Sequence, residues 1–331
     1  MISLHNKKVL VTGAGGFIGS HLVETLLEKG ADVRAFVKYN GRNDWGMLSD
    51  IPSGSQKSIE VIAGDICDPF FVRKAVHGCD YVFHLAALIG IPYSYIAPSN
   101  YVLVNVQGTV NVLQACSDER TLRLIHTSTS ETYGTAQYVP IDEKHPLQGQ
   151  SPYAASKIAA DKMTESYYRS FELPVVTVRP FNTFGPRQLA RAFIPTVISQ
   201  ALTQNKLVLG SLDPVRDLTF VKDTAEGLVT VGLCDKVLGQ TVNLGVGTGN
   251  TVREVVKAIL KLVGKEGMPI VQEPSRVRPT KSEVVRLISN NTIAREKCGW
   301  EPKYSLEQGL AETVEWIKKN IDRFRPDSYV V

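Results

Sequence analysis

The stretch KVLVTGAGGFIGSHLVETLLEKG, residues 8–30, decides the fold. Its first part, Lys8–Thr12, is a short apolar run rich in β-branched residues, which predicts a buried strand. Its last part, Ser20–Lys29, has the apolar spacing of an amphipathic helix. A glycine-rich turn joins the two, so the stretch predicts a strand, a tight turn and a helix.

The turn holds Gly13, Gly16 and Gly19 in the spacing G-x-x-G-x-x-G. Glycine lets the backbone turn tightly and approach a pyrophosphate without a Cβ in the way, while the helix start supplies N–H groups and the positive end of its dipole. We therefore predict a dinucleotide site here, with Phe17 and Ile18 of the first helical turn among its contacts. A plain strand–helix turn is the alternative.

Strand and helix patterns alternate through the first half of the chain. Further strands are predicted at Val33–Val37, Ile59–Ala63, Tyr81–Leu85, Leu122–Thr127 and Val175–Arg179, and helices at Val102–Ala115 and Tyr153–Phe171. Near-continuous apolar strands between helices predict an α/β fold, a doubly wound parallel sheet of the Rossmann type with a smaller C-terminal substrate domain.

The second half has more loops and fewer clear strands. Helices are predicted at about Ile194–Gln204, Val252–Val263 and Leu306–Asn320, and strands that could return to the sheet at Asp217–Val221 and Thr241–Leu244. We assign residues 1–180 plus about 216–246 to a dinucleotide-binding domain. Residues from about 181–215 plus 247–331 form the substrate domain.

Composition and charge narrow the class of protein. The 331 residues suffice for about two domains, and a net charge of +4 without long basic runs argues against nucleic-acid or membrane partners. Five scattered cysteines without a Cys-x-x-Cys pair predict reduced thiols and a cytoplasmic protein. We find no signal peptide before the first strand, no apolar run of about 20 residues and no His/Cys cluster suited to a metal.

The end of the second predicted strand bears on which dinucleotide binds. NAD sites usually place an Asp or Glu there for the ribose 2′-hydroxyl, whereas this chain has Val37 and Lys38. A cation suits a 2′-phosphate, so we predict NADP, with NAD possible; a surface role for Lys38 is the alternative. Asp65 and Ile66 follow the third strand and are predicted to flank the adenine; an ordinary turn Asp is the alternative. Residues 85–87 (Leu85, Ala86 and Ala87) follow the fourth strand and complete the predicted cofactor contacts.

Tyr153 and Lys157 form a Tyr-x-x-x-Lys pair at the start of the long helix. One helical turn places both side chains on the same face, and an ammonium near a phenol lowers its pKa, so that Tyr153 takes a proton from an alcohol. The fifth strand ends in TSTSETYG, which places Thr129, Ser130 and Glu131 at the edge of the sheet beside a nicotinamide. Helix capping is the alternative for these hydroxyls.

These motifs, together with several further ones, resemble the extended short-chain dehydrogenase/reductase family. The further motifs are HLAA (84–87), Asn105, RPFNTFGP (179–186), RDLTFVKD (216–223) and RPTKSEV (278–284). The resemblance runs nearly end to end, and it implies an enzyme that acts on nucleotide sugars with a tightly held NAD or NADP. The C-terminal substrate domain would then bind the nucleotide sugar.

The STSE motif at residues 128–131 is similar to that of GDP-mannose 4,6-dehydratases, although UDP-glucuronate decarboxylases also show Ser-Glu. The run from residue 126 to residue 157 looks closest to the 4,6-dehydratases of the legionaminic-acid pathway, which act on a nucleoside-diphosphate N-acetylglucosamine. Those relatives are usually described as NAD enzymes, which conflicts with the interpretation of Lys38. For the nucleotide and diphosphate, the resemblance implies Asn182 and Arg216, then Arg278 and Glu283, with Arg191 a weaker candidate.

The expected reaction converts an NDP-hexose, UDP- or GDP-N-acetylglucosamine, to its 4-keto-6-deoxy product by internal hydride transfer through the bound cofactor. Tyr153 with Thr129 deprotonates the 4-hydroxyl, Glu131 takes the hydrogen on carbon 5, and Glu131 or Ser130 protonates the departing 6-hydroxyl. The alternatives are a sugar 4-epimerase or UDP-glucuronate decarboxylase. A dinucleotide-binding protein without activity is a third interpretation, against which the intact Tyr153, Lys157 and Glu131 count.

The long helix also bears on assembly. The resemblance implies that helices 102–115 and 153–171 pair with their symmetry mates, and the second carries more apolar surface than one sheet face covers. Its apolar residues are Ala154, Ala155, Ile158, Ala159, Met163, Tyr167 and Phe171. We therefore predict a homodimer, with Tyr153 and Lys157 facing inward. Coverage of this face by the C-terminal helices is the alternative.

Overall fold

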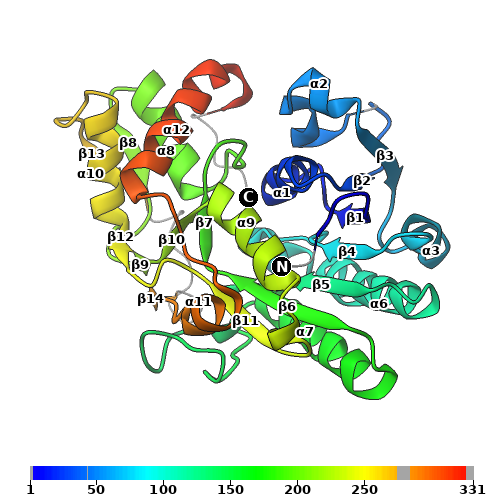
Figure 1. Ribbon diagram of the computed structural model, residues 1–331. Coiled ribbons are helices and arrows are strands. Elements are labelled where there is room, and N and C mark those ends of the chain that lie inside the picture. Colours follow the sequence, from blue (N-terminus) through cyan, green and yellow to red (C-terminus); the bar gives the residue numbers. More distant parts are fainter. Residues whose placement is uncertain (1–2, 43, 274–283, 326–331) are drawn as a thin grey trace.

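A seven-stranded parallel sheet runs through the middle of the larger lobe (Figure 1). The computed structural model describes residues 3–42, 44–273 and 284–325. Strand order is β11-β6-β5-β4-β1-β2-β3, which confirms the predicted doubly wound parallel sheet. The strands are β1 (Lys8–Thr12), β2 (Asp32–Lys38), β3 (Ile59–Gly64), β4 (Tyr81–His84), β5 (Arg123–Thr127), β6 (Val175–Pro180) and β11 (Thr241–Leu244).

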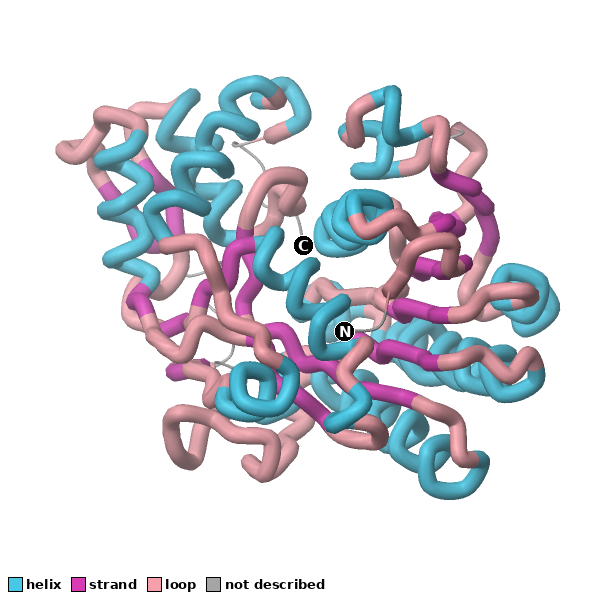
Figure 2. The backbone as a smooth tube through the Cα atoms, viewed as in Figure 1, coloured by secondary structure: helices cyan, strands magenta, loops and turns pink. Residues whose placement is uncertain are grey.

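Helices cover both faces of this sheet (Figure 2). One face is packed by α1 (Phe17–Glu28), α9 (Val221–Gly232) and α11 (Thr292–Cys298), and the other by α3 (Pro69–Val76), α6 (Gly108–Asp118) and α7 (Pro152–Phe171). Successive side chains of β1 alternate between the two cores: Val9 and Val11 pack with α1, and Leu10 packs with α3 and α6. Both faces of the sheet are therefore buried, as parallel strands require.

A second lobe has its own apolar core around the helices α8, α10 and α12. These helices span Phe193–Thr203, Val252–Leu262 and Leu306–Lys319. Small sheets flank them: β7 (Asn182–Phe184) with β10 (Leu218–Phe220), β8 (Leu207–Leu209) with β13 (Ile270–Gln272), and β9 (Val215–Arg216) between β12 (Asn250–Thr251) and β14 (Arg286–Leu287).

One strand prediction is wrong in its partner. Within the predicted segment Asp217–Val221, Leu218–Phe220 forms β10, which pairs in parallel with β7 and does not return to the large sheet. The edge beside β6 is already taken by β11, where Thr241 is in register with Thr177. The strand β10 therefore has no free edge there and pairs outside the sheet.

The predicted helix Val102–Ala115 also differs from the observed one. Residues 102–107 form a π-helix, and α6 begins only at Gly108. Two short helices precede it, α4 (Ile91–Ile96) and α5 (Pro98–Tyr101). The wide turn places Asn105 where its amide bonds the N–H and C=O of Leu88 and the hydroxyl of Ser156. These hydrogen bonds of Asn105 accompany the departure from a regular α-helix. Such π turns often occur at functional sites.

The remaining elements are short. They are η1 (Gly46–Asp50), α2 (Ser53–Gln56), η3 (Ser130–Tyr133), η4 (Asp235–Val237) and η7 (Ile321–Arg323). All five cysteines are free thiols, as predicted. Among the helices of residues 3–42, 44–273 and 284–325, none combines the length and apolarity needed to cross a membrane.

Candidate active site

The predicted site residues gather at the carboxyl edge of the large sheet. The glycine turn follows β1, residues 85–87 follow β4, and residues 128–131 follow β5. The strands β1 and β4 are neighbours, and the chain leaves them in opposite directions along the sheet. Such a reversal is where ligands bind in doubly wound folds.

The glycine turn forms a cradle lined by backbone. Gly13 has φ +70°, and a Cβ there would lie 2.8 Å from the N of Ala86. A Cβ at Gly19 would collide with the carbonyl oxygen of Gly13. Gly16 caps α1 without a side-chain hydrogen bond, so the N–H groups of its first turn, at Phe17 and Ile18, stay available. The cradle fits the pyrophosphate of a dinucleotide.

Thr12, which the sequence motifs did not single out, joins this cradle to the loop after β4. Its hydroxyl oxygen accepts hydrogen bonds from the N–H groups of Leu85 and Ala86, both at 3.2 Å, and contacts Nδ1 of His84 at 2.8 Å. The backbone of residues 85–87 is thereby held beside Gly13. The sequence feature that could have identified Thr12 is a polar residue at the end of an otherwise apolar strand.

Lys38 and Asp65 lie side by side at the ends of β2 and β3. Lys38 is exposed and in parallel register with Gly64, the residue before Asp65. The carboxylate of Asp65 accepts the N–H of Cys67 at 2.9 Å, and the buried Ile66 accepts the amide of Asn111 through its carbonyl. These residues therefore border the same end of the sheet, as predicted.

Tyr153 lies in a buried cluster at the start of α7. Its phenol lies beside the hydroxyl of Thr129, which acts to lower the phenol pKa, and its ring packs edge-on against Tyr101 with centroids 6.2 Å apart. Thr129 in turn accepts the N–H of Glu131 at 3.2 Å. Lys157 is 4% exposed, and its Nζ donates to the carbonyl oxygen of Thr127 at 2.8 Å. Tyr153, Lys157 and the end of β5 thus form one unit, with Ser130 buried beside them.

The acid–base properties of this pair differ from the sequence prediction. Burial raises the pKa of the Tyr153 phenol; the Thr129 hydrogen bond opposes that shift, and the charge of Glu131 adds to it. Burial lowers the pKa of Lys157 to about 8. Nζ of Lys157 donates to the Thr127 carbonyl, and burial is the largest influence on the phenol pKa. A low phenol pKa therefore requires a further positive charge or donor beside the ring.

The predicted substrate residues divide between two places. Asn182 begins β7, and its buried Oδ1 has no hydrogen-bond partner within the described part of the chain. Arg216 lies two residues before Leu218, the residue of β10 that is in parallel register with Asn182. Arg278 and Glu283 lie outside the described residues.

Arg191 lies at the phenol end and not with Arg216. Its guanidinium packs on Gly90, where a Cβ would collide with Nη1, and its charge acts on Tyr101. Tyr101 is the ring that packs against Tyr153 and donates to the Gly90 carbonyl. No sequence spacing predicts this position, because the contact crosses from the second lobe to the loop after β4.

A clamp that no sequence motif indicated joins α1 to the loop after β7. Arg187 is 8% exposed, adopts φ +66°, and donates to Glu24 at 2.6 Å and to the hydroxyl of Ser20 at 3.2 Å. Burial and the Arg187 charge lower the pKa of His21 to about 3, so the neutral ring donates through Nε2 to the Pro186 carbonyl at 3.0 Å. The cofactor cradle and the second lobe are fixed to each other there.

Known proteins match this arrangement over its whole length. A family profile described as GDP-mannose 4,6 dehydratase matches residues 10–313. A mouse dTDP-D-glucose 4,6-dehydratase is 31% identical, with 96% of this chain and 91% of the relative covered. The chain belongs to the GDP-mannose 4,6-dehydratase family.

Solved structures of the family share the fold. The Streptomyces venezuelae dTDP-glucose 4,6-dehydratase DesIV, with NAD and TYD bound, superposes with a TM-score of 0.88 at 29% identity, over 97% of this chain and all of that one. A UDP-N-acetylglucosamine 4-epimerase from Methanobrevibacter ruminantium, in complex with UDP-N-acetylmuramic acid, gives 0.86 at 28% identity, over 96% and 99%. The prediction of an extended short-chain dehydrogenase/reductase, an NAD(P)-dependent sugar-nucleotide 4,6-dehydratase, is confirmed.

Proposed function

We propose that the chain converts UDP- or GDP-N-acetylglucosamine to the 4-keto-6-deoxy sugar nucleotide. The observation that carries the dehydratase chemistry is the carboxylate of Glu131 beside the Thr129–Tyr153 pair, since removal of a hydrogen from carbon 5 needs a base there. The N-acetyl group is supported by the resemblance of residues 126–157 to enzymes of such substrates. The relatives named above are dTDP-glucose 4,6-dehydratases, so dTDP-glucose is the main alternative substrate.

The residues of the site divide the proton transfers among them. Thr129 orients the phenol of Tyr153, which takes the proton of the sugar 4-hydroxyl. The dinucleotide, when bound, supplies the chemistry of a hydride acceptor and donor. Glu131 takes the proton of carbon 5, made acidic by the 4-ketone, and returns it, directly or through Ser130, to the departing 6-hydroxyl. The C6–O bond breaks as a C5=C6 double bond forms and one water leaves. Carbon 6 would then receive the hydride equivalent removed from carbon 4, and carbon 5 a proton equivalent to the one that Tyr153 took, so the sugar shows no net oxidation.

A panel of nucleotide sugars tests this assignment. Purified protein is incubated with UDP-N-acetylglucosamine, GDP-N-acetylglucosamine, UDP-glucuronate and dTDP-glucose, and products are weighed by mass spectrometry. Loss of one water from an N-acetylglucosamine nucleotide is the expected result. An isomer of unchanged mass would identify a 4-epimerase, loss of carbon dioxide from UDP-glucuronate a decarboxylase, and turnover of dTDP-glucose alone would reject the N-acetyl proposal.

We also propose a division of labour between the lobes. Residues 1–180 plus about 216–246 hold the dinucleotide and the acid–base groups, and residues from about 181–215 plus 247–331 hold the nucleotide sugar. The guanidinium of Arg216 suits the diphosphate, whose oxygens accept its hydrogen bonds, and the unpartnered amide oxygen of Asn182 suits an N–H or O–H donor of the base or sugar. Arg191, placed near Tyr101, suits the sugar end of the same substrate.

The bound cofactor is proposed to be NADP. Val37 and Lys38 end β2 without a carboxylate for the ribose, and Lys38 is exposed and free to approach a 2′-phosphate. We expect NADP in extracts of the denatured protein, identified by chromatography and mass, and about a tenfold gain in the NAD-to-NADP ratio for Lys38→Glu. Lys57→Glu, in the exposed turn before β3, is the matched control. Recovery of NAD alone from the wild type would reject the proposal.

The proposed homodimer rests on an apolar surface around η2 (Val102–Gln107) and α7. Tyr153 and Lys157 are buried, as predicted. Ala154 and Tyr167, which were predicted to lie on the apolar face of the interface, are also buried, so fewer residues of α7 are exposed for an interface than predicted. Exposed apolar residues continue onto the elements packed against α7. They are Ile96 (68%), Val102 (58%) and Leu103 (50%), with Phe171 (59%) at the end of α7 itself. Exposed apolar side chains on these neighbouring elements suit contact with a second copy of the chain.

Light scattering at micromolar concentration checks the assembly. We expect a mass of about twice the 36.4 kDa of the chain for the wild type, and the mass of one chain for Leu103→Asp, because a buried charge opposes association. Leu262→Asp, at an exposed apolar position of α10, serves as control and should leave the dimer intact. A wild-type mass near 36.4 kDa would remove the support for the interface.

A further inference from the structure

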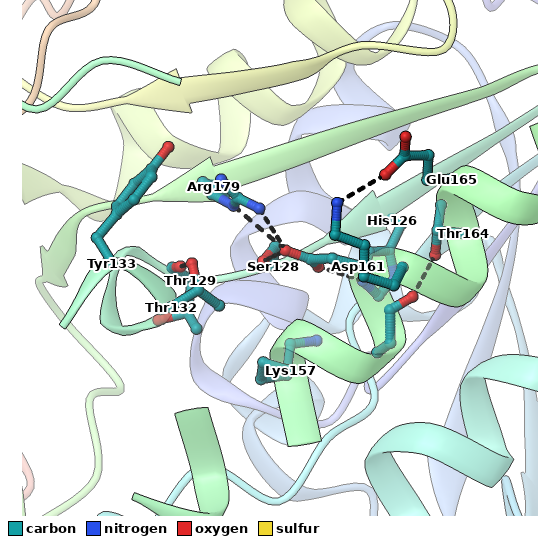
Figure 3. Close-up of polar contacts among 12 residues, drawn as sticks. His126, Ser128, Thr129, Thr132, Tyr133, Lys157, Asp161, Thr164, Glu165 and Arg179 are labelled. Atoms are coloured by element: carbon teal, nitrogen blue, oxygen red, sulfur yellow. Dashed lines mark hydrogen bonds and ion pairs between the residues drawn. The ribbon is translucent and has the colours of Figure 1, made fainter. Parts of the chain in front are cut away.

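Asp161 is a buried carboxylate at the meeting point of the elements that carry the catalytic residues (Figure 3). It lies on α7, one turn after Lys157 and two turns after Tyr153, and so on the same side of the helix. It is 6% exposed. No sequence motif singled it out, and the proposed proton transfers do not use it.

Three side chains from two strands converge on this carboxylate. One oxygen, Oδ2, accepts from the hydroxyl of Ser128 and from Nη2 of Arg179, both at 2.7 Å. The other, Oδ1, lies 3.2 Å from Nε2 of His126. His126 and Ser128 lie at the end of β5, and Arg179 lies in β6. Asp161 therefore ties α7 to two neighbouring strands of the large sheet.

Each of these contacts adjoins a residue of the proposed reaction. Ser128 directly precedes Thr129, and the Thr127 carbonyl before it accepts Nζ of Lys157. Arg179 lies three residues before Asn182, and its guanidinium stacks 4.9 Å above the ring of Tyr133. A displacement of Asp161 would therefore shift both the end of β5 and the start of α7, which hold the phenol between them.

The charge of Asp161 also acts on the lysine. Burial alone would raise the pKa of the Asp161 carboxyl, but Arg179, His126 and Lys157 hold it below its ordinary value, so the group is ionised. Burial lowers the pKa of Lys157, and the Asp161 carboxylate opposes that shift. An opposite charge close to a buried ammonium favours its protonated form.

The other titratable groups around this pair are Tyr153 on α7, His126 on β5, His84 on β4 and Arg179 on β6. Burial lowers the pKa of both histidines, so both rings are neutral. The charged groups of this cluster are therefore Asp161, Arg179 and Lys157. Arg179 is paired with Asp161 at short distance and adds no free positive charge beside the lysine.

We propose that Asp161 is a positioning residue of the reaction, which keeps Lys157 in its ammonium form and aligns the end of β5 with the start of α7. The inference rests on the proposed function, in which Tyr153 takes the proton of the 4-hydroxyl beside Lys157. Asp161 acts through these two residues and touches neither substrate nor cofactor.

The pH dependence of kcat/KM for dehydration tests the proposal. Asp161 raises the pKa of both Lys157 and Tyr153, so Asp161→Asn should move both limbs of the bell-shaped profile to lower pH by about one unit. The ratio of wild-type to variant kcat/KM then rises about fivefold between about pH 6.5 and about pH 8.5. Ser128→Ala removes a neutral partner of the same carboxylate and should leave the profile at its wild-type position.

A second variant covers the case that Asp161→Asn does not fold. Asp161→Asn/Arg179→Gln removes both charges and leaves no lone guanidinium in the interior; its profile should move in the same direction by a smaller amount, because the lost guanidinium charge had opposed the carboxylate. A profile that drops uniformly without moving, in either variant, would overturn the proposal and leave Asp161 a structural residue. A wild type without dehydratase activity, or an active Tyr153→Phe, would instead reject the proposed function, so the two failures are distinguishable.

Discussion

Replacing Glu131 with Gln is expected to lower the rate of water loss from the substrate by about 10²- to 10⁴-fold, the range that general acid–base groups contribute. The substituted amide would keep the shape of the side chain and the backbone hydrogen bond to Thr129, but it accepts no proton from carbon 5. Cofactor content and thermal stability should stay at wild-type values. Mass spectrometry of the sugar nucleotide over time measures the loss of water.

Glu165→Gln provides the matched control for this change. Glu165 lies on the same long helix, near its exposed side, where it pairs with Lys162 and Arg169. The same chemical substitution should leave dehydration within about twofold of the wild type, since surface ion pairs contribute little. Dehydration by Glu131→Gln at a rate close to that of Glu165→Gln would remove Glu131 from the mechanism.

Replacing Tyr153 with Phe is expected to lower kcat by about 10³-fold, equivalent to about 4 kcal/mol in the activation barrier. The aromatic ring keeps its edge-on contact with Tyr101, so the fold stays intact, but the hydroxyl that bonds Thr129 is lost. The neighbouring phenol of Tyr101 cannot replace it, because it donates its hydroxyl to the Gly90 carbonyl. Steady-state kinetics and the content of bound dinucleotide are the measurements.

Tyr138→Phe is the control for the loss of a phenolic hydroxyl. Tyr138 is 44% exposed and donates to Asp142 at 2.8 Å, away from Thr129 and Lys157. Its kcat should match the wild type. A Tyr153→Phe enzyme that retains kcat while its KM rises would assign the phenol to binding and not to proton transfer.

Local patterns in the sequence sufficed to predict the sheet. The strand β1 occupies Lys8–Thr12 as predicted, and α7 begins one residue before its predicted start, because Pro152 is tolerated in the first turn. These elements are set by apolar spacing and capping, both of which are local. The strand β10 was misplaced because its partner depends on which sheet edges are free, a property of the whole fold.

The site shows the same difference between features set by local sequence patterns and features set by long-range contacts. The glycine cradle and the Thr129–Tyr153 contact follow from motifs with fixed spacing. The pKa of the phenol was predicted in the wrong direction, since the dominant cause is burial and burial depends on distant residues such as Tyr101. The contacts of Arg191 and Asp161 join segments far apart in the chain, and no spacing in the sequence reports them.

The clamp between Arg187 and α1 has a consequence for the distance between the two bound reactants. One helix carries both the cradle for the phosphates and Glu24, the anchor of the loop that follows Asn182. The two reactants would therefore meet across a gap whose width is built into the folded chain and is not reset with each substrate. A reaction that removes a hydride at one carbon and restores it at another benefits from such a fixed gap, because the protein's own groups are brought into position once, during folding, and not in every turnover.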